Sequence, residues 1–190
     1  ELGYSELAAT NRLATRVVNR AAFSAGVPVV DIQSASNEIG DLTIQGYHAI
    51  NYGTIWANSA NFPAIGLLIR GSSVAGDTGR THGRTLTITN CVNCLQLNES
   101  ALTQHADFAQ WDKLRLSVSR RGIVSKSQQV TSTHFTTVDG QGVQDLIDFE
   151  SGGNATFDNV YYGALGPFSQ GTVIKIGGPN YTFNHQQFNF

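Results

Sequence analysis

Two acidic residues in the last third of the chain have a spacing that suits acid–base chemistry. Asp148 and Glu150 stand two positions apart in the strand-like segment Ile147–Glu150, and such residues share one face of a strand at a backbone separation of about 6.5–7 Å. Glycosidases use two carboxyl groups at comparable distances, because their mutual repulsion can raise one pKa and set an acid beside a base. Asp148 and Glu150 are therefore the candidate catalytic residues.

A structural role for the same pair is the simpler interpretation. Lys126 stands at the position of Glu150 in the preceding strand-like segment, and Lys175 stands at the position of Asp148 in the following one. In a stacked sheet these would form two cross-strand ion pairs, each contributing up to about 1 kcal/mol. Ligand binding by the two carboxylates is a third interpretation.

The segment Gly46–Pro63 is the candidate binding loop. It is rich in Asn and Ser, and its aromatic and histidine residues are Tyr47, His48, Tyr52, Trp56 and Phe62. Aromatic rings with a few polar groups are typical of ligand sites, and the apolar face of a sugar ring can stack on them. We expect Tyr47, Tyr52 and Trp56 to contact carbohydrate; packing against the chain itself or against a neighbouring subunit is the alternative.

Arginine and histidine side chains offer a second kind of sugar contact. Guanidinium groups can bind the carboxylates of acidic sugars in pairs of hydrogen bonds, and five arginines are candidates: Arg80, Arg84, Arg115, Arg120 and Arg121. A polysaccharide lyase would also need a base, for which His134 is available. Ordinary solvated or ion-paired surface arginines are the alternative. The other histidines show no metal-binding spacing, so we expect no metal and no cofactor.

Two families of short strand-like segments recur along the chain and would position these residues. In the first family the second residue is polar and the third is large and apolar; its members are Leu42–Gln45, Leu86–Thr89, Leu114–Ser117, Thr133–Thr136, Ala155–Asp158 and Tyr181–Asn184. In the second family the first residue is Ile or Leu; its members are Leu67–Arg70, Leu95–Asn98, Ile123–Lys126, Ile147–Glu150 and Ile174–Gly177. Their later spacings approach the roughly 20–28 residues of one solenoid coil. A β-sandwich is the alternative.

The alignment of these families predicts which side chains point outward. Arg115 and His134 would be neighbours in an outward column of the first family. The corresponding column of the second family contains Leu68, Gln96, Val124, Asp148 and Lys175. Inward columns of Ile, Leu and Phe would touch at the strand spacing of about 4.8 Å and form the core.

The N-terminal part of the chain has a different composition. Ser5 to about Ala25 is rich in Ala, Arg and Leu, with apolar residues at near-helical spacing. Gly26 and Pro28 can end a helix. We expect an amphipathic helix that caps the open end of the solenoid, with a domain boundary near residue 30 (1–30 and 31–190).

Composition excludes several classes of protein. Lys and Arg number 12 against 14 Asp and Glu, and charged residues are only 14% of the chain, which disfavours a nucleic-acid binder. No apolar run approaches the roughly 20 residues of a membrane span. There is no methionine, so we expect a processed product or part of a longer chain.

Cys91 and Cys94 form one CxxC motif. This spacing is compatible with packing thiols, a local disulfide, or a metal or redox site.

The segment Thr85–Leu97 resembles a coil of the right-handed parallel β-helix proteins of the pectin-lyase-like superfamily, and Ile65–Ser73 resembles their second strand. Within that superfamily the low charge, the many Thr, Asn and Gly residues and the N-terminal segment resemble bacteriophage tailspikes and tail-fibre depolymerases. The resemblance covers roughly Asp41 to Phe190. It implies an all-β fold, here a right-handed parallel β-helix of about six coils with an N-terminal helical cap.

The same resemblance implies a function. Phage tailspikes and tail-fibre depolymerases are homotrimers that bind, and often cleave, bacterial surface polysaccharide. We therefore expect a trimeric receptor-binding protein of the virion tail, with no nucleic acid and no membrane insertion. Two other interpretations stay open. One is a monomeric secreted polysaccharide lyase or glycoside hydrolase, and the other is a structural shaft or adhesin module without activity.

Overall fold

The computed structural model describes the chain in twelve stretches, which comprise residues 2–4, 15–18, 27–33, 38–46, 64–70, 80–99, 106–127, 130, 132–151, 153–163, 171–177 and 188–189. These residues form strands and the turns between them, and they contain no helix. The strands are β1 (Leu2–Tyr4), β2 (Thr15–Val18), β3 (Pro28–Ile32), β4 (Glu38–Ile39), β5 (Leu42–Gln45), β6 (Ile65–Ile69), β7 (His82–Thr89), β8 (Asn93–Leu97), β9 (Gln110–Ser125), β10 (Thr133–Phe149), β11 (Ala155–Gly163), β12 (Thr172–Ile176) and β13 (Phe188–Asn189).

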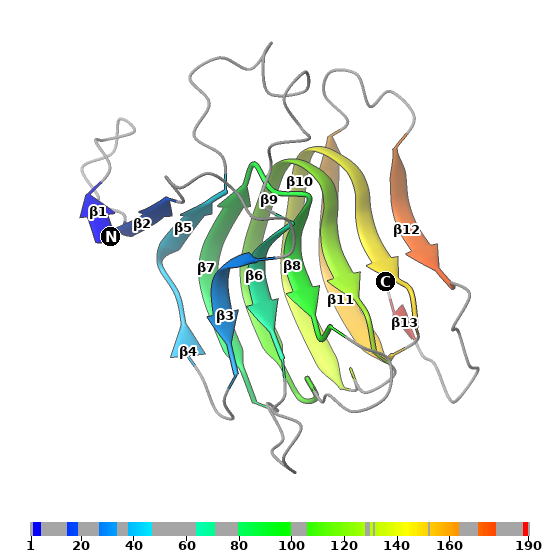
Figure 1. Cartoon of the computed structure of the whole chain (residues 1–190). Helices are drawn as coiled ribbons and strands as arrows, with labels where there is room; N and C mark the ends of the chain where they lie inside the picture. Colours follow the sequence, from blue (N-terminus) through cyan, green and yellow to red (C-terminus); the bar gives the residue numbers. More distant parts are fainter. Residues whose placement is uncertain are drawn as a thin grey trace.

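The strands make one curled sheet, which is parallel throughout except for the antiparallel pair β1–β2. One wall has the order β2-β5-β7-β9-β10-β11-β13, and the other has the order β3-β6-β8-β9-β10-β12. The two long strands β9 and β10 belong to both walls, because the first part of each pairs with β7 or β11 and the last part with β8 or β12. Figure 1 shows the half-barrel that results.

A repeated backbone conformation accompanies the turn from one wall to the other. Asn90, Val118 and Gly142 directly follow residues that pair with one another in β7, β9 and β10. All three have positive φ, at 59°, 50° and 67°. Such values turn the chain sharply and suit Gly and Asn, whereas a β-branched residue adopts them at a cost. The bend therefore recurs at one register position of the sheet, although the residues there, Asn, Val and Gly, differ.

The core lies inside the curl and is built from stacked apolar side chains. The paired residues Ile44 and Ile88 are fully buried, as are the paired residues Leu86 and Leu114. An aromatic stack continues the core, in which the ring centroids of Phe135 and Phe157 are 4.8 Å apart and nearly parallel. Stacked rings of this kind add to the free energy gained by burying apolar area.

The structure confirms the alignment of the second family of repeats. Leu67, Leu95, Ile123, Ile147 and Ile174 pair successively across β6, β8, β9, β10 and β12. Val30 of β3 extends the same column at its start, a member that the sequence comparison missed.

The alignment of the first family is wrong at two steps. At its C-terminal end, Ala155 and Thr156 of β11 pair with Phe188 and Asn189 of β13, and not with Tyr181 and Thr182 as predicted. Between β9 and β10, Phe135 pairs with Trp111, and Leu116 pairs with Gly140, so the predicted match of Leu116 with Phe135 is five residues out of register. The cause is a second, gentler bend inside each long strand. Two successive residues, Asp112 and Lys113 in β9, are not buried there, so the polar–apolar alternation changes phase and two stretches of one strand show the same pattern.

The predicted outward column of the second family is largely buried. Leu68, Val124 and Asp148 have no exposed surface and Gln96 is 5% exposed, whereas Lys175 at the end of the column is exposed. All five residues of β6 and all five of β8 are buried, so these two strands are covered on both faces, whereas β12 at the edge of the wall is largely exposed. An outward position in a curled sheet is thus not necessarily a solvent position.

The predicted N-terminal helix is not confirmed. Thr15–Val18, in the middle of that segment, form β2 and pair in parallel with β5. The sequence of β2 is Thr-Arg-Val-Val, and its β-branched residues favour a strand. The remainder of residues 5–25 lies outside the described residues. In the described part of the chain, no helix has the length and hydrophobicity to cross a membrane.

Candidate functional site

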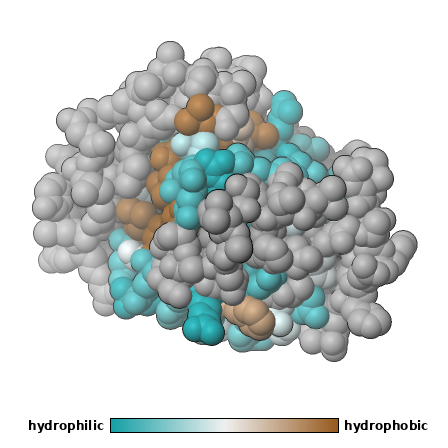
Figure 2. Space-filling view, turned by 60° about the horizontal axis from the view of Figure 1, so that its bottom comes forward, coloured by the Kyte–Doolittle hydropathy of each residue, from teal (hydrophilic) through white to brown (hydrophobic). Residues whose placement is uncertain are grey.

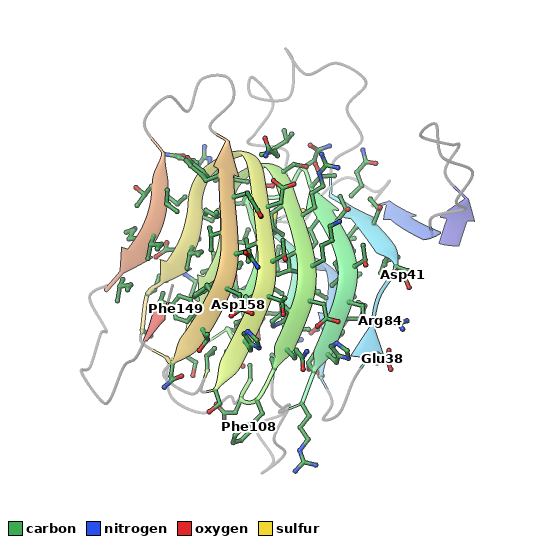
Figure 3. The ribbon with its side chains drawn as sticks, turned by 180° about the vertical axis from the view of Figure 1, so that it is seen from behind. Glu38, Asp41, Arg84, Phe108, Phe149 and Asp158 are labelled. Carbon is green, nitrogen blue, oxygen red and sulfur yellow. The ribbon has the colours of Figure 1, made fainter. Side chains whose placement is uncertain are left out.

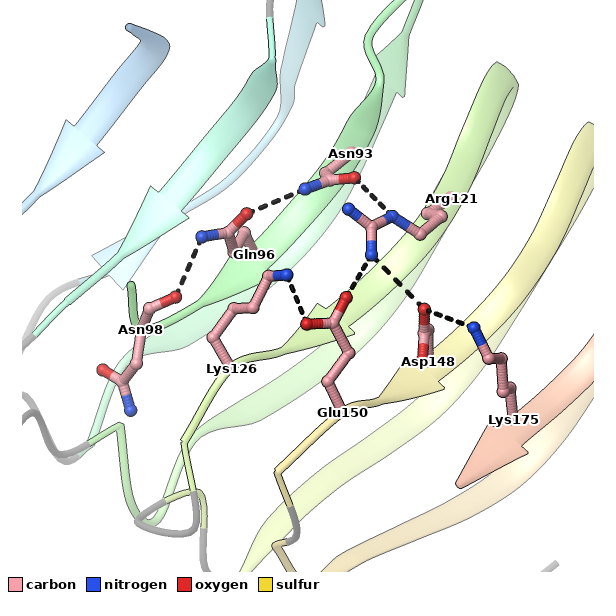
Figure 4. A network of polar contacts seen from close by, with 8 residues as sticks. All are labelled: Asn93, Gln96, Asn98, Arg121, Lys126, Asp148, Glu150 and Lys175. Carbon is pink, nitrogen blue, oxygen red and sulfur yellow. Dashed lines mark hydrogen bonds and ion pairs between the residues drawn. The ribbon is translucent and has the colours of Figure 1, made fainter. Parts of the chain in front are cut away.

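Asp148 and Glu150 lie at the end of β10, on the outer side of the wall formed by β8, β9, β10 and β12. Their neighbours Ile147 and Phe149 point into the core. Asp148 is fully buried and the side chain of Glu150 is 27% exposed. Both carboxylates belong to the polar network shown in Figure 4.

Three cations surround the two carboxylates. The Arg121 guanidinium contacts both of them, with Nη1 bonded to Glu150 and 3.4 Å from Asp148 Oδ2. Lys126 Nζ donates to Glu150, and Lys175 Nζ lies 3.7 Å from Asp148 Oδ2. The two cross-strand ion pairs that the sequence predicts, Lys126–Glu150 and Lys175–Asp148, are thereby confirmed.

The charges around Glu150 decide its protonation. Burial alone would raise the pKa of Glu150, but the hydrogen bond from Lys126 and the charges of Lys126 and Arg121 outweigh it and lower the pKa below its usual value. A general acid at neutral pH needs the opposite shift. The surroundings of Glu150 therefore suit an ionised carboxylate in a salt-bridge network better than a proton donor.

Amide side chains extend the network across the wall. Arg121 Nε donates to Asn93 Oδ1 at 2.8 Å, Asn93 Nδ2 donates to Gln96 Oε1 at 2.8 Å, and Gln96 Nε2 donates to the Asn98 backbone carbonyl at 3.0 Å. Asp148 Oδ1 is buried without a hydrogen-bond partner among the described residues. Arg121, which links the amides to the carboxylates, was considered from sequence only as a contact to acidic sugars. The alignment of the second family places Arg121 opposite Asn93, as the structure has it, and this was the sequence signal for its contact with the amides.

Arg115 and His134 are not brought together. His134 pairs in register with Gln110, and Arg115 pairs with Asp139, so the two lie at different levels of the wall. Arg115 is 61% exposed, with Nε 3.7 Å from Asp139 Oδ2. His134 Nε2 lies 2.8 Å from Asp158 Oδ2. The predicted pairing of a base with an arginine fails for the same five-residue register error.

A second group of polar residues covers the other wall. We call it the outer face, and it comprises His82 and Arg84 of β7, Gln110 and Asp112 of β9, His134 of β10 and Asp158 of β11. Figure 3 views this side of the sheet and labels Arg84 and Asp158 on it. Arg84 is ion-paired with Glu38 and Asp41, at 3.2 and 3.6 Å.

The outer face contains one histidine–aspartate arrangement twice. His82 Nε2 lies 2.9 Å from Asp112 Oδ2, and His134 reaches Asp158 in the same way. In both cases the aspartate is two residues beyond the register partner of the histidine on the next strand. The hydrogen bond with His82 lowers the pKa of Asp112, assisted by Gln110, whose Nε2 donates to Asp112 Oδ1 at 3.0 Å. Both carboxylates can accept further hydrogen bonds.

Phe108 stands at the lower end of this face (Figure 3). Its side chain is 58% exposed and its φ is +55°. Arg80 and Ser132, at the same position before β7 and β10, also have positive φ, at 73° and 53°. Sequence reasoning missed Phe108, because an isolated phenylalanine is normally assigned to the core. The sequence signal is the small Ala106 and Ala109 on either side of it, which are buried in the structure together with Asp107.

The other residues singled out from the sequence are the loop aromatics and the two cysteines. Tyr47, Tyr52 and Trp56 lie outside the described residues. Cys91 and Cys94 are free, buried thiols, and burial raises the pKa of Cys94 to about 12, so they are packing residues. Across the described ranges there is no cluster of three or more metal-binding side chains.

Comparisons of the chain with known protein families, with curated proteins and with solved structures found no match. The pectin-lyase-like assignment thus stays a prediction.

Proposed function

We propose that this chain is a right-handed parallel β-helix of about six coils that binds bacterial surface polysaccharide as a homotrimer of the virion tail. The parallel registers that link β5, β7, β9, β10 and β11 support the coil architecture. The parallel registers of β3, β6, β8, β9, β10 and β12 support it along a second wall. Stacked coils bury a continuous core and leave long outward columns for binding.

The outer face is the observation that carries the proposal. It presents carboxylates, imidazoles, an amide and a guanidinium on neighbouring strands about 4.8 Å apart. Its residues are partly or largely exposed, whereas Asp148 on the other wall is buried. Figure 2 shows that hydrophilic residues are prominent on the described surface in that view, with hydrophobic residues in one larger zone and in one separate group near the lower edge. A rigid, hydrogen-bonding surface of this kind suits a chain of sugar hydroxyls.

Cleavage of the bound polysaccharide by Asp148 and Glu150 is a separate part of the proposal. If the pair is catalytic, Asp148→Asn and Glu150→Gln each abolish release of reducing ends or of unsaturated ends while the fold is preserved. An unchanged rate in both variants would remove the pair from the catalytic site, and no release of ends by the parent chain would leave a binding protein.

The experiment that tests binding is an array of purified bacterial surface polysaccharides, neutral and acidic, probed with the whole chain. We expect retention of a limited set of glycans, and light scattering at about three times the 20.4 kDa chain mass. Retention by a monomer would favour a secreted enzyme. No retention of any glycan would favour a structural module and contradict the proposed function.

A further inference from the structure

We propose that Phe108 is the aromatic platform of a subsite for neutral sugar units, with the outer face supplying its hydrogen bonds. This inference rests on the proposed function and assigns the place and the ligand class of that binding. Its elements are the exposed ring of Phe108, the amide of Gln110 and the two histidine–aspartate pairs.

The backbone turn, not the phenyl ring, requires the positive φ at Phe108. Arg80 one coil earlier and Ser132 one coil later also have positive φ, although neither side chain resembles that of Phe. Ala106 and Ala109 fill the buried positions of the turn. A small polar residue would therefore serve the turn at position 108 at least as well.

The phenylalanine at position 108 destabilises the folded chain in two ways. Positive φ disfavours residues with a Cβ other than Asn and Asp, and a ring that is 58% exposed forgoes much of the free energy of apolar burial. Residues that disfavour the fold gather at functional sites. An exposed aromatic ring at such a position is suited to stacking on the apolar face of a sugar.

Hydrogen-bonding groups lie within one sugar unit of the ring. Gln110 follows Phe108 by two positions and is likewise exposed. Its register partners are His82 and His134, so the backbones of both histidines lie about one strand spacing, ~4.8 Å, from that of Gln110. A sugar stacked on Phe108 can therefore reach Gln110 and at least one of the histidine–aspartate pairs with its hydroxyls.

The charge of the surface selects neutral sugars. On the outer face the one guanidinium, Arg84, is already paired with Glu38 and Asp41, and the carboxylates of Asp112 and Asp158 stand on the same face. Recognition of acidic sugars requires an excess of available cations. The carboxylates of Asp112 and Asp158 would repel a uronate and accept hydrogen bonds from hydroxyls.

The test compares Phe108→Asn with Val118→Asn. Both substitutions place Asn at a position of positive φ, but Val118 lies at the bend between the walls, away from the proposed subsite. We expect Phe108→Asn to melt at a higher temperature than the parent chain, because Phe108 is exposed, and Val118→Asn to stay folded with a similar melting temperature, because Val118 is buried. Phe108→Asn should weaken affinity for a neutral glycan retained on the array at least tenfold, and Val118→Asn should leave it within twofold. Phe108→Tyr, which keeps the ring, should bind like the parent.

The outcomes separate the subsite from the proposed function. If the parent chain binds glycans and Phe108→Asn binds equally well, the subsite is wrong and polysaccharide binding stands. If Phe108→Asn loses both thermal stability and affinity, the ring is structural and the subsite is wrong. Retention of uronate-rich glycans alone would overturn the assignment to neutral sugars. Failure of the parent chain to retain any glycan would overturn both proposals.

Discussion

Val118 occupies the same bend position as Asn90, one strand further along the sheet, and both residues have positive φ. Asn adopts this conformation readily, whereas a β-branched residue does so at a cost of about 1–2 kcal/mol. The third residue of the column, Gly142, also suits it. Val118 is thus the residue of the three that conflicts with its backbone.

Relief of that conflict in Val118→Asn contributes about 1 kcal/mol, but Val118 is only 9% exposed and the substitution gives up apolar burial. We therefore expect the stability to stay within about 1 kcal/mol of the parent chain. The measurement is the urea midpoint at constant m-value. The reverse change, Asn90→Val, should destabilise by at least about 1 kcal/mol. A loss of more than about 1 kcal/mol in Val118→Asn would mean that the side-chain contacts of Val118 outweigh the strain.

Arg121→Met should destabilise the protein by about 2 kcal/mol, because it removes the cation shared by Asp148 and Glu150 and leaves a buried carboxylate less well compensated. Equilibrium unfolding measures the effect. Arg115→Met is the matched control, since Arg115 is 61% exposed and its ion pair should contribute less than about 0.5 kcal/mol. Equal effects of the two substitutions would contradict the bridging role of Arg121.

Acid should weaken the network through Glu150. Its pKa is lowered from 4.5 in the folded state, so its contribution to stability is complete above pH 4.5 and is lost as the pH falls through the lower, folded value. The urea midpoint of the parent chain should therefore fall below pH 4.5 more steeply than that of Glu150→Gln. Parallel pH profiles for the two proteins would show that Glu150 does not have a lowered pKa in the folded state.

The thiols of Cys91 and Cys94 should not react in the folded protein. Both are fully buried, and burial raises the pKa of Cys94 from 9.0 to about 12. Their contribution to stability is therefore complete below pH 9 and is lost as the pH rises toward 12. Alkylation by iodoacetamide at pH 8 should follow the rate of global unfolding. Rapid labelling in the absence of denaturant would contradict this environment.

The regular recurrence of apolar residues that face the core made much of the fold predictable from sequence. The column from Leu67 to Ile174 was aligned correctly because each of its residues faces the core and tolerates only apolar side chains. The pairs Lys126–Glu150 and Lys175–Asp148 followed from the same register. The parallel, all-β architecture was thus contained in the local pattern.

The errors arose where local pattern and long-range geometry differ. The bend at Asp112 and Lys113 changes the phase of the alternation, so no local rule could distinguish the true partner of Phe135 from a false one. Thr15–Val18 combine helix-compatible spacing with β-branched residues, and pairing with β5 decides in favour of a strand. The exposure of Phe108 depends on a φ value that its sequence neighbours do not determine.

The continuity of β9 and β10 across both walls has a consequence for how the chain folds. Phe135 pairs with Trp111, which precedes it by 24 residues, so the neighbouring strands β9 and β10 meet after one short excursion of the chain. The entropy of closing such an excursion is modest compared with that of a sandwich of similar size. We therefore expect the pair formed by β9 and β10 to be the folding nucleus, from which order spreads outward one strand at a time in both directions.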